Sequence, residues 1–575
     1  WVGVWISVRC NLKVAAAAAR GSAADALKLS FCGGAVSSII SAAMCILGLG
    51  MLYATCFYVF VVHGSLHANS VPLLMVGYGF GASFVALFMQ LGGGIYTKAA
   101  DVGADMIGKV EAGIPEDDHR NPAVVADLVG DNVGDCAGSM ADVFESIAAE
   151  VLGTMILGAQ LAKEANIKDA SGFVFFPLVI HTLDLVVSSV GIMIVRVAPN
   201  SMTDDPLKLM RRAYAVAAVL ALGAFYVATH SMLSSPKHPD AAYYFFLCGL
   251  VGIATSYLLI IITQYYTDYE YGPVRSIAAA STTGHGTNVI AGMSVGMEST
   301  GLPVLVVCGA LLSSYSLGNM TGLPTPIAGI FGTASATMGM LGTAVFVLSM
   351  NNFGPIADNA GGIVEMSSQD DAVRVVTDKL DAVGNVTKAA TKGYAVGGSA
   401  LACFILFRAY LDEVSEMTGK TMDVVDITKV EVLVGGVLGI MMVFVFVGWA
   451  LASVGRTAQE VVKEVRRQFK DKPGILENTQ RPEYDTCVAI VTKAALREMF
   501  KPAILALGFP VVYVVPSSHV AHLLSIAHPL PLLSPPVHSP LATSRDVGAA
   551  WDLCSSTLVR TLDDPSSPQR CWLAS

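Results

Sequence analysis

The sequence predicts an all-α protein, built as a polytopic transmembrane helix bundle. Its 575 residues have a mean hydropathy of +0.60, with 54% hydrophobic and only 14% charged side chains. A soluble protein of this length would carry about a quarter charged residues. The 55 glycines are typical of helices that pack closely in lipid. The third observation is a series of apolar runs that approach the roughly 20 residues needed to cross a bilayer.

We expect about eleven spans, of which the last is the weakest. They lie near residues 31–62, 71–97, 132–162, 173–198, 213–231, 243–265, 302–320, 327–353, 393–410, 431–453 and 502–515. Short connections between them favour antiparallel neighbours. The opening WVGVWISV resembles the tail of a span already under way, so we expect that N-terminal spans are missing.

The stretch from Gly92 to Glu150 carries twelve carboxylates between apolar runs. Burying a carboxylate costs several kcal/mol unless a cation or a hydrogen bond replaces its water. At helical spacing, one stripe falls within about 60° and contains Lys98, Asp101 and Asp105. A second stripe falls within about 80° and contains Asp131, Asp135, Asp142 and Glu145. The acidic loop Glu111–Asp127 joins the two helices.

Two acidic helices joined by an acidic loop predict a cage of oxygen ligands. Such ligands, with His119 and Cys136 as the one histidine and the one thiol of the stretch, favour Mg²⁺ over zinc or copper. The alternative is a solvated charged face beside a span, which does not usually repeat Asp at helical spacing inside apolar runs. The net charge of −10 argues against nucleic acid as a partner.

Further polar segments interrupt the second half of the chain. The motif GPIADNAGGIVEM brings Asp358 to the end of an apolar span, and GNVTKAATKG follows. We expect Lys392 in that motif to snorkel at the membrane interface. Ser281–Gly301 is predicted as a loop or the start of a helix, with His285 structural. The basic segment Arg456–Tyr484 is predicted as a cytosolic loop without chemistry.

Three of these motifs closely resemble those of membrane-bound, ion-pumping inorganic pyrophosphatases. They are GGGIYTKAADVGADMIGKVE, IPEDDHRNPAVVADLVGDNVGD and GPIADNAGGIVEM. The resemblance covers the chain from Trp1 to about Gly508. It implies a helical bundle with about eleven of the family's sixteen spans present, and a homodimer.

The resemblance also implies roles for matching positions. Lys98 and Asp101 are implied to contact substrate or metal directly. Lys98 is also implied to be catalytic. Mg²⁺ ligands are implied at Asp105, Glu116, Asp127 and Asp131. Further metal and substrate ligands are implied at Asp358 and Asn385. Asp135 resembles one of two aspartates that hold the attacking water, and Asp142 and Glu145 lie where the family has its ion gate.

Two positions resemble the potassium-independent, proton-pumping branch of that family. Gln90 stands where many potassium-dependent members have Arg, and Lys388 stands where they have Ala. A fixed ammonium replaces a bound K⁺ because each places one positive charge near the same phosphate. Thr391 also fits this branch.

The leading hypothesis is therefore Mg²⁺-dependent pyrophosphate hydrolysis coupled to proton pumping. We expect the catalytic side to face the cytosol, from an endomembrane (vacuole-like or Golgi-like) or the plasma membrane. One alternative is a secondary transporter whose carboxylates bind ions without hydrolysis. The other is an inactive fragment, since residues 509–575 are rich in Pro, Ser and His and lack two Lys- and Asp-rich motifs of the family. We expect that tail to be unrelated to the bundle and an artefact of the gene model.

Overall fold

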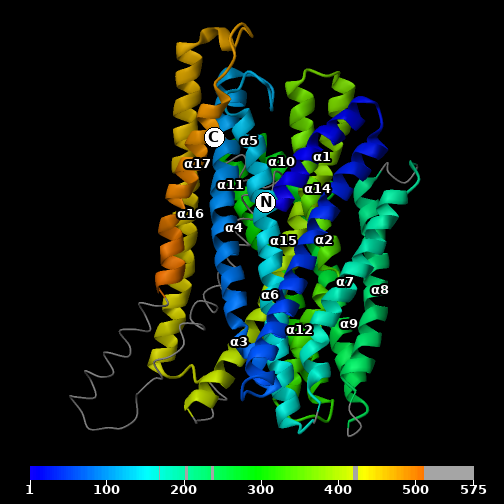
Figure 1. Ribbon diagram of the computed structural model, residues 1–575. Helices are drawn as coiled ribbons and strands as arrows, with labels where there is room; N and C mark the ends of the chain where they lie inside the picture. The colour runs from blue at the N-terminus through cyan, green and yellow to red at the C-terminus, as the bar shows by residue number, and fades with distance from the viewer. Residues whose placement is uncertain (168, 201–204, 235–237, 419–424, 510–575) are drawn as a thin grey trace, which may run out of the picture.

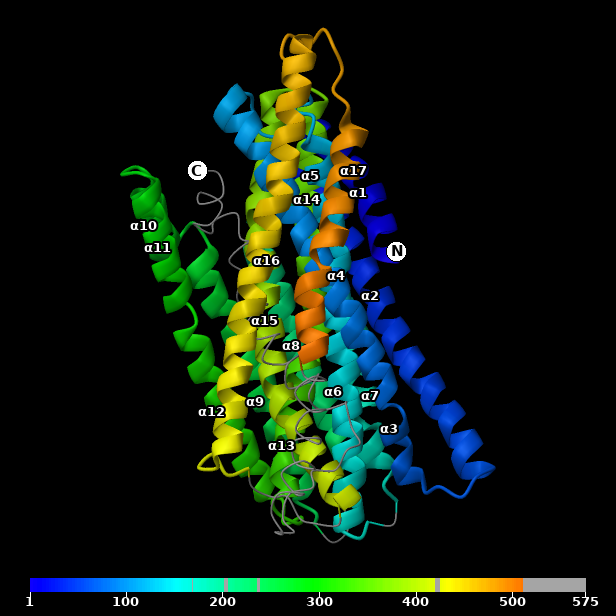
Figure 2. The same cartoon turned by 90° about the vertical axis from the view of Figure 1, so that its left-hand side faces the viewer.

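The computed structural model describes residues 1–167, 169–200, 205–234, 238–418 and 425–509. Within those ranges every regular element is a helix, as the composition predicts. The long helices run side by side along one common direction in both views (Figures 1 and 2). Helices α10 and α11 lie at the edge of the bundle in Figure 2.

Seventeen α-helices follow one another along the described chain. They are α1 (Val2–Ala19), α2 (Ala23–Cys56), α3 (Val71–Leu74), α4 (Val76–Asp105), α5 (Val124–Asp131), α6 (Ser139–Glu164), α7 (Ser171–Val197), α8 (Pro206–Met232), α9 (Ala241–Thr267), α10 (Gly272–Ser281), α11 (His285–Glu298), α12 (Gly301–Asn319), α13 (Ile327–Leu341), α14 (Ala344–Met366), α15 (Asp371–Thr418), α16 (Val430–Asp471) and α17 (Tyr484–Glu498). Short π-helical and 3-10 turns lie between some of them: η1 (Phe57–Val62), η2 (Ala68–Ser70), η3 (Met106–Ala112), η4 (Asn132–Gly138) and η6 (Pro473–Ile475).

Nine described helical segments are long and apolar enough to cross a membrane, or ten if α13 and α14 form one bent span. The N-terminal segment Val2–Ala19 is one of them, where the sequence predicted only the tail of a span. The expected span over 132–162 is helical, but α6 is not one of these nine segments because its acidic residues make it less apolar. The weakest expected span, 502–515, extends beyond the described residues.

Two polar segments are more helical than their composition indicates. Of the two alternatives for Ser281–Gly301, the structure has the helix: α11 begins at His285, in a candidate span that continues to Asn319. The prediction of a loop over Arg456–Tyr484 is wrong for its first half, because α16 continues to Asp471. A helix of 42 residues is about twice the length that a bilayer needs, so its basic end projects beyond the apolar layer.

Among the described residues, one small cluster between α7, α8 and α9 and two large hydrophobic cores hold the bundle together. The larger joins α2, α6, α7, α13 and α14 around buried aromatic side chains such as Phe173, Phe331 and Phe346. The smaller joins α4 to α16 and α17. Close helix contacts depend on glycine, since a Cβ at Gly252 of α9 would lie 1.8 Å from the carbonyl oxygen of Ala336 in α13.

A 44° bend separates α13 from α14 and leaves backbone groups unsatisfied inside the bundle. Side chains from other helices satisfy them. Asp184 of α7 accepts a hydrogen bond from the Val345 amide (3.2 Å), and Tyr394 of α15 donates to the Met340 carbonyl (2.9 Å). The bend is therefore built into the packing, and it fixes the direction in which α14 approaches the acidic helices.

Candidate active site

The acidic stretch folds back on itself, so that α5 and η4 lie against α4. The hydroxyl of Thr97 on α4 donates a hydrogen bond to the Gly130 carbonyl (2.7 Å). A Cβ at Gly134 would lie only 2.2 Å from the same hydroxyl oxygen. Glycines four residues apart thus give α5 and η4 a flat face against α4, and the intervening Asp131 and the adjacent Asp135 turn toward the bundle interior, where both are buried.

Lys98 and Asp101 share one buried face of α4, as their spacing predicts. The Lys98 Nζ lies 3.5 Å from an Asp101 carboxylate oxygen, and both side chains are buried. One turn further, Asp105 pairs with Lys109 (3.1 Å). Lys109 also pairs with Glu116 of the acidic loop (2.8 Å), so a lysine that the sequence did not single out joins the helix to the loop.

Lys388 of α15 lies between two carboxylates from different parts of the chain. Its ammonium is 2.9 Å from Asp135 of η4 and 3.4 Å from Asp358 of α14. Lys388 is 4% exposed, and it also interacts electrostatically with Asp131. A buried ammonium shared by carboxylates is strongly held, because removing it leaves uncompensated negative charge.

The Lys388 side chain reaches this position through a gap that glycine leaves open. A Cβ at Gly354 of α14 would lie 2.7 Å from Lys388 Cε and 2.9 Å from Cγ. A Cβ at Gly384 of α15 would lie 2.7 Å from the Gly354 Cα. Close contact between α14 and α15 at these two glycines is therefore what admits the long side chain.

Arg374 of α15 ties the acidic loop to the second half of the bundle. Its guanidinium donates to Asp117 (3.1 Å) and to the Gly361 carbonyl of α14 (2.6 Å). Burial and the nearby Asp358 and Glu116 charges still raise the pKa of Asp117 to about 7, against the opposing effect of Arg374. The sequence analysis missed this arginine, because no local pattern separates it from a solvated one.

Negative charge is concentrated across α4 and α5. Burial, followed by the charges of Asp101 and Asp131, raises the pKa of Asp127 well above its usual range. Carboxylates that repel one another in this way are all ionised together only when additional positive charge is present. The lysines described above supply part of that charge.

The donor set fits a divalent cation that prefers oxygen ligands. All the candidate ligands are carboxylates apart from Asn385, whose buried Oδ1 has no hydrogen-bond partner among the described residues while its amide nitrogen donates to Asp381 (3.2 Å). Within the described ranges no three His, Cys, Asp or Glu side chains enclose a metal position by themselves. Mg²⁺ characteristically takes one or two carboxylates and completes its shell with water and substrate phosphate oxygens, so an open arrangement of this kind suits it.

Below Asp135, carboxylates continue down α6. Glu145 accepts a hydrogen bond from Ser83 of α4 (2.6 Å), and Asp142 lies one turn above it.

Gln90 of α4 is partly buried, and its carbonyl oxygen has no partner among the residues described. Thr391 of α15 donates to the Val347 carbonyl of α14 (3.1 Å).

The structure corrects one expectation about the lysines. Lys392 does not snorkel at an interface: it is 7% exposed and interacts electrostatically with Asp135. Snorkelling was expected because Lys392 begins an apolar run, but α15 is already helical from Asp371 and carries the residue inside the bundle.

Comparison with known proteins shows which family the chain resembles. The profile of the family described as "Inorganic H+ pyrophosphatase" matches residues 1–553. The chain belongs to this family. It is accordingly a multi-pass helical membrane protein, and the acidic helices α4 and α5 carry the pyrophosphatase motifs that the sequence analysis identified.

Relatives of the H⁺-pyrophosphatase family align with most of the chain. It is 56% identical over 522 residues to "Pyrophosphate-energized membrane proton pump 3" of Arabidopsis thaliana, covering 89% of this chain and 65% of that protein. It is 51% identical to "K(+)-insensitive pyrophosphate-energized proton pump 2" of Moorella thermoacetica, and 49% identical to a "K(+)-insensitive pyrophosphate-energized proton pump" of Caldanaerobacter subterraneus. Both alignments cover 89% of this chain, with 73% and 71% of the respective relative. The chain thus spans about two thirds of the length of these relatives.

Proposed function

We propose that the protein hydrolyses Mg²⁺-pyrophosphate to phosphate and couples this reaction to proton transport across a membrane. The observation that carries the proposal is the buried Lys388 between Asp135 and Asp358, beside the acidic face of α4 and α5. It combines fixed positive charge for a phosphate with a carboxylate held close by. Membership of the H⁺-pyrophosphatase family supports the same reaction.

In this proposal the side chains divide the chemistry among them. Lys98 places a point charge on a phosphate oxygen. Asp135 holds the attacking water and accepts its proton as general base. Its pairing with Lys388 keeps the carboxylate ionised before the reaction and orients it.

Mg²⁺, when bound, would supply positive charge that offsets the negative charge of the phosphate oxygens. The residues that would hold it are those of the acidic face and the facing α14 and α15: Asp101, Asp105, Glu116, Asp127, Asp131, Asp358 and Asn385. The unpartnered Asn385 oxygen supports this assignment. Asp142 and Glu145 would then receive protons from the site and act as the gate toward the membrane.

The test uses the purified protein, in its longest natural form, in sealed vesicles. We expect phosphate release that requires both pyrophosphate and Mg²⁺, together with acidification of the lumen that a protonophore abolishes. Hydrolysis without acidification would remove the coupling. Ion movement that needs no pyrophosphate would favour a secondary transporter instead.

Gly354→Ala is expected to lower the rate of hydrolysis by about a hundredfold, because a displacement of about 1 Å at a site has that effect. The added methyl would overlap the Lys388 side chain and push its ammonium away from Asp135. Gly361→Ala, on the same helix, is the matched control, since its Cβ would meet nothing nearer than 3.5 Å. Equal rates for the two variants would contradict the proposed role of the gap.

We also infer that the site faces the cytosol. The basic end of α16 lies at the same end of the molecule as the acidic loop, where Arg466 pairs with Glu111, and basic segments are retained on the cytosolic side. Labelling with a membrane-impermeant reagent at the end of α16 in intact organelles tests this orientation. An endomembrane (vacuole-like or Golgi-like) or the plasma membrane is the expected location, which microscopy of the tagged protein decides.

Two further properties complete the proposal. Rates insensitive to K⁺ follow from Lys388 and agree with relatives that are named K⁺-insensitive. A homodimer is the expected assembly, and its mass in detergent is measurable by light scattering; a monomeric mass would exclude it.

A further inference from the structure

Glu150 of α6 is a buried acid that the proposed reaction does not use. It is 1% exposed, and neither carboxylate oxygen has a hydrogen-bond partner among the described residues. Gly398 of α15 lies against it, because a Cβ there would be 3.3 Å from a Glu150 carboxylate oxygen. The charged group that interacts with it is another acid, Glu145, closer to the active site on the same helix.

A second polar group near Glu150 is the hydroxyl of Tyr394. Tyr394, one turn before Gly398 on α15, interacts electrostatically with Glu150 and with Asp184 of α7. Its hydroxyl also donates to the Met340 carbonyl at the bend between α13 and α14 (2.9 Å). Tyr394 is therefore an electrostatic neighbour of two buried acids that belong to different helices, while its hydrogen bond goes to Met340.

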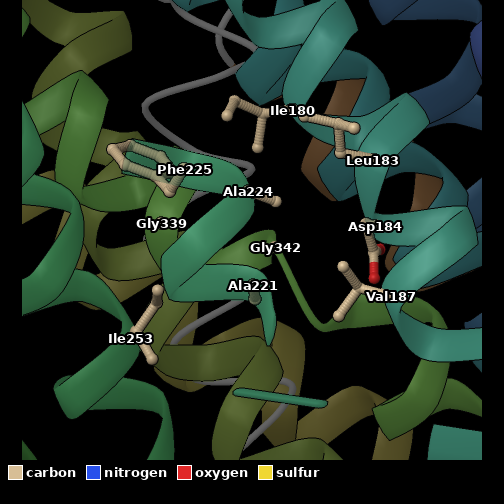
Figure 3. A pocket seen from close by; sticks show the side chains of 10 residues that line it. All are labelled: Ile180, Leu183, Asp184, Val187, Ala221, Ala224, Phe225, Ile253, Gly339 and Gly342. Atoms are coloured by element: carbon tan, nitrogen blue, oxygen red, sulfur yellow. The ribbon is translucent and has the colours of Figure 1, made fainter. Parts of the chain in front are cut away.

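Asp184 lines a small cavity between α7, α8, α9 and α13, shown in Figure 3. The cavity is about 10 Å³, near the space that one water molecule needs. Among the ten residues that line it, Asp184 is the one that ionises, and the others are apolar. Asp184 is therefore a carboxylate beside space for one water molecule.

The surroundings of Glu150 favour a proton over a metal cation as its partner. A buried carboxylate without a donor or a cation is costly in its charged form, so the neutral, protonated form is favoured. A metal ion would need several oxygen ligands, but neither Glu150 oxygen has a polar partner within the described ranges. A protonated acid inside a pump has one evident use, which is to pass that proton on.

We propose that Glu150 is an additional proton-carrying residue, below the gate carboxylates and on the way to Asp184. When side-chain motion brings the Glu150 carboxyl and the Asp184 carboxylate within hydrogen-bond distance of the Tyr394 hydroxyl, Glu150 gives its proton to the hydroxyl oxygen. The hydroxyl, released from the Met340 carbonyl, passes its own proton to Asp184. A proton from Glu145 then restores the Glu150 carboxylic acid. Each step breaks one O–H bond and forms another, so no further reactant is needed. The inference rests on the proposed pumping function.

The experiment compares Glu150→Gln with wild type in vesicles, measuring phosphate release and lumen acidification in the same sample. We expect the Gln variant to hydrolyse pyrophosphate near the wild-type rate, while protons moved per pyrophosphate fall about tenfold or more. Glu150→Asp, which still ionises, is expected to recover part of that ratio. Glu164→Gln, at the other end of the same helix, is the control and is expected to keep the wild-type ratio.

The inference would be overturned if the Glu150→Gln variant kept the wild-type ratio of protons moved per pyrophosphate. It would also be overturned if the Gln and Asp variants lost hydrolysis and acidification to the same extent. If the Gln variant does not accumulate in membranes, Tyr394→Phe decides, because it removes only a hydroxyl: a lowered ratio with hydrolysis retained supports the route, and an unchanged ratio overturns it. Wild-type protein without pyrophosphate hydrolysis would instead refute the proposed function, so the two failures are distinguishable.

Discussion

Asp131→Asn is expected to lower phosphate release by about a hundredfold or more, and Asp101→Asn is expected to do the same. Both side chains are buried, at 9% exposure for Asp131 of α5 and 6% for Asp101 of α4. The amide has the same shape but no charge, so packing is kept while the attraction for a divalent cation is lost. The rate of phosphate release at saturating pyrophosphate is the measurement, on protein shown to be inserted in the membrane.

A binding readout separates loss of metal from loss of chemistry. Mg²⁺ together with an unreactive bisphosphonate should stabilise the protein against heat. Both variants should need a higher Mg²⁺ concentration than wild type to reach the same stabilisation. Asp471→Asn is the control, because Asp471 pairs with Arg467 at the exposed end of α16. Near-normal activity and Mg²⁺ requirement in both site variants would remove these aspartates from the proposed metal site.

Lys388→Ala is expected to make hydrolysis depend on K⁺. Wild type should give the same initial rate with and without K⁺, because a fixed ammonium already lies 2.9 Å from Asp135 and repels a second cation by about 1 kcal/mol or more at a few ångströms. The Ala variant leaves Asp135 and Asp358 without that charge and leaves room for an ion. Initial rate against K⁺ concentration, at fixed Mg²⁺ and pyrophosphate, is the measurement.

Lys388→Met is the matched variant. Methionine fills most of the same space without charge, so no K⁺ can enter, and we expect low activity at every K⁺ concentration. A wild-type rate that climbs several-fold with K⁺ would contradict the potassium-independent assignment. If wild type and the Ala variant are both unaffected by K⁺, the assignment stands and the ammonium-for-potassium mechanism is wrong.

The sequence by itself determined the fold class and the composition of the acidic face. Mean hydropathy and long apolar runs predict a helical membrane protein because lipid requires every backbone group to bond within a helix. Helical periodicity also placed Lys98 beside Asp101, since residues three apart on a helix share a face whatever surrounds them.

Only the tertiary structure decided which charges meet across the bundle. Lys388 lies 253 positions after Asp135 in the chain, and their contact depends on two glycines that let α14 and α15 approach. Lys392 was misassigned because burial is a property of the neighbouring helices and not of the residue. Arg374 gave no local signal for the same reason, and Glu150 was counted with the acidic stretch but not distinguished from the other carboxylates. Spacing fixes the face of a helix on which a side chain lies, whereas packing fixes what that face contacts, and a buried charge is defined by its contacts.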